Sequence, residues 1–372
     1  MKRQSSRLPP PPPERFASID ALRGMALFWL MGGQTLILRL LALSPVAIPG
    51  PVFRGLDRSA WAGLTIVDLV FPLLLFLSGC VLPGSLNRHS ANSKTLWLRV
   101  IRRGVLLVIL QMICNGLLQF NAPRVNLIGP LTHLGVCSVV VATLLISSKL
   151  RIQVISAAGL LLLHSLITGS IPLSERMTAD FTTSGSFEAT LSRNLQPLLQ
   201  GRAALPTVLN YGVCTLLPAA FIMLIGSFAG RLLLAEPRIS VRITTLLCSA
   251  GGMLYLGQWW SQSLPFIPSL WSGSYVLYGI GCCLAVLLLA HLLVDLPGQG
   301  AGSLFFIVIG YNSLLVWLTP FLVNFDWISA FLLGRLARSS GQAADLLLAL
   351  GSILIQWLIL AFLFRQRLRL GV

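Results

Sequence analysis

The sequence predicts an all-α membrane protein, a polytopic bundle of about ten membrane-spanning helices. Of its 372 residues, 55% are hydrophobic and only 10% are charged. The mean hydropathy, +0.83, is also high. Such a composition excludes an ordinary soluble enzyme. Apolar runs of about 20 residues recur along the chain, and one helix needs that length to cross a bilayer.

The chain starts with a basic, proline-rich tail, residues 1–15, which we expect to be an extended cytoplasmic spacer. Residues 16–372 are expected to form a single transmembrane domain. A shorter segment, 327–338, has aromatic residues on one side and arginines on the other, which favours an interfacial helix. The predicted spans lie near residues 20–42, 62–84, 99–119, 127–147, 153–170, 205–232, 240–260, 272–296, 304–324 and 344–364.

The basic residues predict the orientation of these spans. If both termini are cytoplasmic, 17 of the 27 basic residues lie on the inner side and eight on the outer side. Positive charge is retained in the cytoplasm, so this split favours a topology with both ends inside. The longest loop, 171–204, is then external. The same distribution accounts for the net charge of +16 without any nucleic-acid partner.

Acidic residues within apolar spans are the first candidates for a site. Asp68 is expected about two turns inside the second span, with Pro72 one turn further on. A carboxylate there costs free energy unless it faces a wet cavity or a partner, and the proline frees a backbone carbonyl. We expect either a pocket or an ion pair with a neighbouring helix. Asp20 and Arg23, one turn apart in the first span, are expected to form a structural ion pair, with a ligand contact as the alternative.

Four histidines are the other ionisable candidates. His133 enters its span from the outer side at a depth similar to Asp68. His89 is expected to be solvated, His164 to be a core residue, and His291 to pair with a carboxylate four residues later for structural reasons. The cysteines lie in apolar segments without metal-type spacing, so no metal site is predicted.

With this topology, several polar side chains collect in the outer halves of the helices and predict a cavity that opens outward. They are Gln34, Thr35, Asp68, Asn126, His133, Asn210 and Tyr211, with Arg58 just above them.

Two stretches, RFASIDALRGMALFWLMGG and WAGLTIVDLVFPLLLFLSG, resemble the opening of heparan-α-glucosaminide N-acetyltransferase and its bacterial relatives. The likeness continues in LLPAAFIMLIGSFAG, LWSGSYVLYGIG, LFFIVIGYNSLLVW and QWLILAFLFR, and it covers essentially the full chain. These relatives are multi-pass acyltransferases that take acetyl from cytosolic acetyl-CoA and deliver it to a sugar across the membrane. The residues that match their motifs are Asp20, Arg23, Trp61, Asp68, Pro72 and Asn312.

The chain departs from this family at the catalytic histidine. Arg58 occupies that position, three residues before Trp61, and an arginine cannot act as a general base. His133 stands where the relatives carry arginine, which suggests that the two residue types have exchanged places. The resemblance then implies His133 as the base, Asp68 as its orienting carboxylate and Arg58 as an electrostatic clamp. The alternative is a packed His133 in a catalytically silent protein.

We therefore expect a divergent membrane acyltransferase with acetyl-CoA as donor, no resident cofactor, and a saccharide or another envelope molecule as acceptor. The expected substrate-binding residues are Gln34, Asn126, Asn210 and Asn312. The expected partners are the lipid bilayer and a second copy of the chain in a homodimer. A silent relative that binds a lipid, a glycan or a protein is one alternative. A secondary transporter is another, which broken helices or inverted repeats would favour, and the sequence shows neither clearly.

Overall fold

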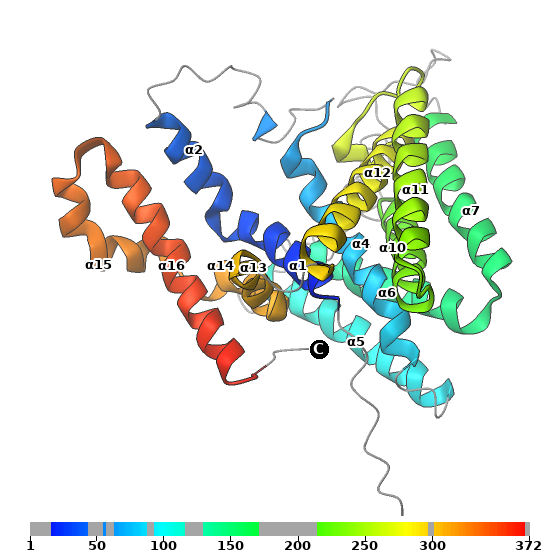
Figure 1. Ribbon diagram of the computed structural model, residues 1–372, viewed down its shortest axis with the longest axis horizontal. Coiled ribbons are helices and arrows are strands. Elements are labelled where there is room, and N and C mark those ends of the chain that lie inside the picture. The colour runs from blue at the N-terminus through cyan, green and yellow to red at the C-terminus, as the bar shows by residue number, and fades with distance from the viewer. Residues whose placement is uncertain are drawn as a thin grey trace, which may run out of the picture.

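The computed structural model describes residues 16–43, 55–56, 63–87, 93–115, 129–170, 214–296 and 301–368 (Figure 1), and every regular element in these ranges is a helix. Eight helices in these ranges are long and apolar enough to span a membrane, or nine spans if one bent pair is included. The all-α, multi-pass architecture is thus confirmed, with eight or nine such spans in these ranges in place of ten.

The first span is broken in the middle. It consists of α1 (Ala17–Phe28), a π-helical turn η1 (Trp29–Gly33) and α2 (Gln34–Ala42). Gly32 has a φ of 110°, which side-chain-bearing residues rarely adopt. The turn makes α2 leave the direction of α1 and widens the helix at this level.

The centre of the bundle is the pair formed by α4 (Ile66–Asn87) and α10 (Leu216–Ala235). Glycines allow their backbones to touch, because a Cβ at Gly226 would lie 2.1 Å from the carbonyl oxygen of Phe76. A Cβ at Gly230 would meet the next turn of α4 at 2.0 Å. Helix α12 (Gly273–Ala290), which continues into the π-helical turn η5 (His291–Asp295), packs beside this pair.

The remaining helices of this part surround that centre. Helices α5 (Ser93–Cys114) and α6 (Pro130–Ser147) pack on each other, and α7 (Leu150–Ser170) and α11 (Ile239–Trp260) lie further out (Figure 1). The segment expected at 99–119 is α5, which begins earlier. It is not among the apolar spans of the described residues, because its first half carries Lys94, Arg99, Arg102 and Arg103.

Hydrogen bonds show which helix ends lie at the same level. At one end, the start of α1 meets the end of η5, where Ser18 Oγ donates to Asp295 at 2.6 Å. We call this the α1 end. At the other end, α4 and α12 both begin, and the Tyr275 hydroxyl donates to the main-chain oxygen of Asp68 at 2.6 Å. We call this the α4 end. The helices of this part therefore cross the same layer in alternating directions.

The C-terminal part contains a second break. Helices α13 (Ala301–Tyr311) and α14 (Ser313–Leu322), which cover the span expected at 304–324, are bent by 71° at Asn312. Helix α15 (Phe325–Ser339) corresponds to the segment predicted at 327–338 and forms a hairpin with α16 (Ala344–Arg365) on the side of the molecule away from α7 (Figure 1). The broken helices that the sequence did not reveal are thus present in the structure.

Candidate functional site

A cavity of about 570 Å³ opens at the α4 end between η1, α2, α4, α14 and the turn that precedes α12. We call it the polar cavity. Aromatic side chains dominate its lining: Trp29, Phe71, Trp271, Tyr275 and Trp317. Its polar side chains are Gln34, Thr35, Asp68 and Ser269. The structure therefore brings together three of the residues that the sequence assigned to such a cavity, namely Gln34, Thr35 and Asp68.

Asp68 is the charged residue in this lining, and its environment differs from the one expected. Helix α4 begins at Ile66, so Asp68 lies in the first turn instead of two turns deep. Its Oδ2 accepts hydrogen bonds from Thr65 N at 3.2 Å and Thr65 Oγ1 at 2.8 Å. The Thr65 Oγ1 in turn accepts from Asp68 N at 3.4 Å. This reciprocal capping arrangement stabilises a carboxylate at a helix N-terminus. The half-buried side chain still borders the cavity.

Trp29 is a lining residue that the sequence analysis missed. It begins the π-helical turn η1, so the break at Gly32 places its ring in the cavity wall. Its Nε1 is buried and has no hydrogen-bond partner in the described part of the chain. A buried donor without a partner costs about 1–3 kcal/mol, which makes this N–H a candidate donor to a bound ligand. The glycine pair that follows, Gly32 and Gly33, was the available signal.

Trp271, another residue of the cavity wall, is held in a strained conformation. Its φ of 53° and ψ of 44° are left-handed, a region that costs a residue with a side chain roughly 1–2 kcal/mol. The Nε2 of His164 lies 3.0 Å from its carbonyl oxygen and 3.2 Å from that of Leu270, so this core histidine fixes the turn. Ser274 Oγ further donates to Leu264 O at 2.6 Å. Strain maintained in this way is typical of binding and active sites.

His133 lies behind this wall instead of in the cavity lining. Its ring stacks on Trp271, with centroids 6.1 Å apart, and meets the edge of Phe71 at 5.7 Å. Nδ1 donates to the Gly129 carbonyl at 2.9 Å, so Nε2 accepts from Thr215 Oγ1 at 2.8 Å. Both ring nitrogens are therefore engaged by Gly129 and Thr215, and the predicted pairing with Asp68, directly or through one water, stays a prediction. The structure favours the packed-core interpretation of His133.

Two other candidates have structural contacts. Asn312 lies at the break between α13 and α14 and is fully buried, and its Nδ2 donates to the Leu368 carbonyl at 3.2 Å. It does not line the polar cavity, so its expected role in substrate binding stays a prediction, while this hydrogen bond stabilises the bend. The predicted ion pair is present, with Arg23 Nη1 3.6 Å from Asp20 Oδ1. Arg58, Trp61, Asn126, Asn210, Tyr211 and His89 lie outside the described residues, as do residues 1–15 and 171–204.

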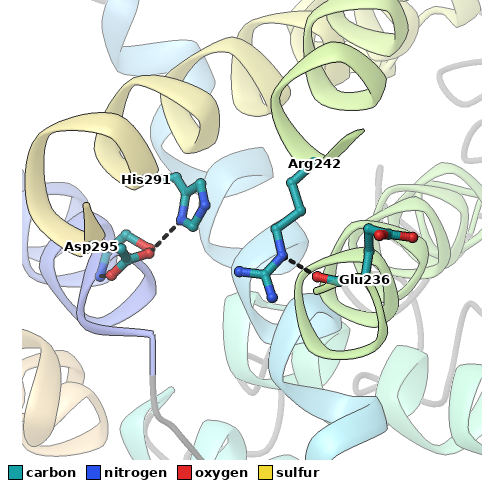
Figure 2. A network of polar contacts seen from close by, with 5 residues as sticks. Glu236, Arg242, His291 and Asp295 are labelled. Atoms are coloured by element: carbon teal, nitrogen blue, oxygen red, sulfur yellow. Dashed lines mark hydrogen bonds and ion pairs between the residues drawn. The ribbon is translucent and has the colours of Figure 1, made fainter. Parts of the chain in front are cut away.

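A second polar cluster lies at the α1 end (Figure 2). His291 Nδ1 is 2.7 Å from Asp295 Oδ2, as the sequence predicted. Asp295 also accepts from Ser18 N at 3.0 Å and therefore caps α1 from another helix. Across from it, the Arg242 Nε donates to the Glu236 carbonyl, and the guanidinium lies 5.8 Å from the centre of the Phe16 ring. These contacts tie helix ends together, which supports the structural interpretation of the histidine pair.

Comparison with known sequences assigns no activity to this arrangement. A family model described as a domain of unknown function, DUF5009, matches residues 15–121. The matched region includes the Asp20–Arg23 pair, Trp29 and Asp68. No curated protein matches the chain.

Proposed function

We propose that the protein is an acyltransferase of the bacterial inner membrane, which moves acetyl from acetyl-CoA to a saccharide or a similar polyhydroxylated acceptor in the polar cavity. The polar cavity carries this proposal, because it combines five aromatic side chains with one carboxylate and an indole N–H that has no partner among the described residues. Flat aromatic surfaces bind the apolar faces of sugar rings, and a few placed polar groups fix their orientation. The resemblance to sugar acetyltransferases supports the same assignment.

In this proposal Asp68 is the general base, because it is the carboxylate in the described lining of the cavity. An acceptor hydroxyl or amine attacks the thioester carbonyl while the carboxylate takes its proton. The C–O or C–N bond forms, the C–S bond breaks, and the CoA thiolate leaves and recovers the proton from Asp68. The Trp29 N–H donates to an oxygen of the bound acceptor. Arg58 remains the candidate for stabilising the negative charge on the carbonyl oxygen.

The orientation belongs to the same proposal. The split of basic residues favours a cytoplasmic α1 end, so in this proposal the acceptor enters the polar cavity from the outer side, and the thioester of cytosolic acetyl-CoA has to reach it between the helices. Cysteine labelling in a cysteine-free variant checks this. A membrane-impermeant reagent added outside should modify a cysteine at Glu188 and spare one at Asn92. The reverse pattern would contradict the orientation.

Acetyl transfer is tested with purified protein in nanodiscs, supplied with radiolabelled acetyl-CoA and a panel of amino sugars and neutral sugars. The proposal requires release of CoA that depends on the acceptor, with label recovered in the sugar. Sugar binding without CoA release would instead support the catalytically silent alternative. The substitution Asp68→Asn should largely abolish this transfer. Asp345→Asn is its matched control, because it removes a carboxylate from an exposed ion pair with Arg39.

Transport is a second candidate, favoured by the two helix breaks. Secondary transporters build their substrate sites from discontinuous helices. Here η1 interrupts the first span and Asn312 separates α13 from α14, and both broken segments contribute residues to the polar cavity. Uptake of a labelled sugar into proteoliposomes without acetyl-CoA, with the sugar recovered unmodified, would favour transport over acetyl transfer.

A further inference from the structure

A second groove lies at the α1 end, remote from the polar cavity. It has a volume of about 630 Å³ and is bounded by the ends of α4, α6 and α10 and the start of α5. Its walls are apolar, with Pro83, Leu86, Leu96, Leu145 and Leu234 among them. We call it the Arg231 groove, because this half-buried arginine is the charged residue in its lining.

Arg231 is held in place by a buried glutamine. Gln153 is 1% exposed, and its Oε1 accepts from Arg231 Nη1 at 2.8 Å. Its Nε2 donates to the carbonyls of Leu144 at 3.1 Å and Ser148 at 2.8 Å. Because these two carbonyls can only accept, the amide oxygen must point at the guanidinium. The orientation of Arg231 is therefore fixed by the ends of α6 and α7.

The charge of Arg231 has no compensating acid in the described residues. Gln153 is neutral, and the ion pairs within the described ranges involve Arg23, Arg39 and His291 instead. A guanidinium has about five N–H donors in a planar fork that fits two oxygens of a phosphate. One of them is used by Gln153, and the side chain lines the groove. A cation fixed above apolar walls is complementary to an anion that carries an apolar chain.

We propose that the Arg231 groove binds an anionic glycerophospholipid, with the phosphate on Arg231 and an acyl chain along the apolar wall. Helix α4 has 22 residues, enough to cross the bilayer, so its end lies at the level of the lipid headgroups. Helix α5, which contributes Leu96 to the groove, adds the exposed cations Lys94, Arg99 and Arg102 at the same end. Such clusters attract anionic lipids, and a groove between helix ends selects one of them. The bound lipid then joins four helices.

Native mass spectrometry of the delipidated protein tests this, with phosphatidylglycerol and phosphatidylcholine titrated back. We expect one tightly bound phosphatidylglycerol and at least about tenfold weaker binding in Arg231→Gln, the loss of one charge-assisted contact. Arg238→Gln is the matched control, because it removes an exposed cation near the same end without altering the groove. It should bind within about twofold of the unaltered protein. Equal losses in the two variants would overturn the proposal.

A second pair of variants keeps the arginine and so does not depend on Arg231→Gln folding. Leu145→Trp fills the groove, whereas Val140→Trp adds the same ring on the lipid-exposed side of the same helix. The first should abolish tight binding and the second should preserve it. A competition experiment with palmitoyl-CoA completes the test. If it displaces phosphatidylglycerol at lower concentration than the lipid itself requires, the groove takes a soluble acyl donor and the lipid assignment is wrong.

Discussion

Asp68 and Asp295 are two carboxylates at opposite ends of the bundle, and both cap a helix N-terminus. Asp295 caps α1 from another helix and accepts from Ser18 N, Ser18 Oγ and His291 Nδ1. Asp68 caps its own helix through Thr65 and borders the polar cavity. The comparison teaches that an acid within a membrane bundle can be stabilised by helix N–H groups, so its presence alone does not mark a site. The role of such an acid depends on the other groups around it, which for Asp68 include the polar cavity.

The largest effect is expected at the α1 end. Asp295→Ala leaves Ser18 and His291 with buried polar groups unsatisfied and removes the side-chain hydrogen bonds between α1 and η5. We expect a loss of about 3–5 kcal/mol in stability, measured by thermal unfolding in detergent. Asp68→Asn should cost less than about 1 kcal/mol, since the amide oxygen still accepts from Thr65 N. Equal destabilisation by the two substitutions would remove the distinction between them.

A smaller effect is expected at the strained wall of the polar cavity. Trp271→Gly and Trp271→Ala both remove the ring from His133 and Phe71, but only glycine adopts a φ of 53° without strain. The glycine variant should therefore be more stable than the alanine variant by about 1–2 kcal/mol. The two melting temperatures measure this difference. An alanine variant as stable as the glycine variant would show that the strain is absent.

The smallest effect on stability is expected at Trp29. Trp29→Phe removes a buried N–H that has no partner in the described residues, so the melting temperature should not fall. Binding of the acceptor should weaken by about tenfold, because its oxygen loses a donor. Calorimetric titration with the acceptor measures this against the unaltered protein. A lower melting temperature combined with unchanged binding would mean that the indole N–H serves the fold and not a ligand.

The sequence predicted the helical spans well, because apolar runs of about 20 residues leave the backbone no alternative to a helix in a bilayer. The Asp20–Arg23 and His291–Asp295 pairs could also be predicted from the sequence, since contacts within one helix turn depend only on local geometry. The start of α4 was placed too early, although the pattern of Thr65 followed three residues later by Asp68 is a readable capping signal.

The candidate site was predicted only in part. Gln34, Thr35 and Asp68 do meet in one cavity, but His133 is packed behind its wall instead of lining it, and Arg58 lies outside the described residues. The contacts of His133 with Thr215 and Trp271 come from residues about 80 and 140 positions away, which no local pattern encodes. The breaks at Gly32 and Asn312 and the pairing of Arg231 with Gln153 depend on tertiary packing in the same way.

The most direct test of the account is the rate of acetyl transfer by Asp68→Asn at a matched amount of folded protein. Asparagine keeps the acceptor for Thr65 N but cannot take a proton from the attacking hydroxyl or amine. With acetyl-CoA and the best sugar acceptor in nanodiscs, we expect a loss of about 10²–10⁴-fold in kcat with a melting temperature close to that of the unaltered protein. An Asp68→Asn variant with full transfer activity would contradict the assignment of Asp68 as the catalytic base of the polar cavity.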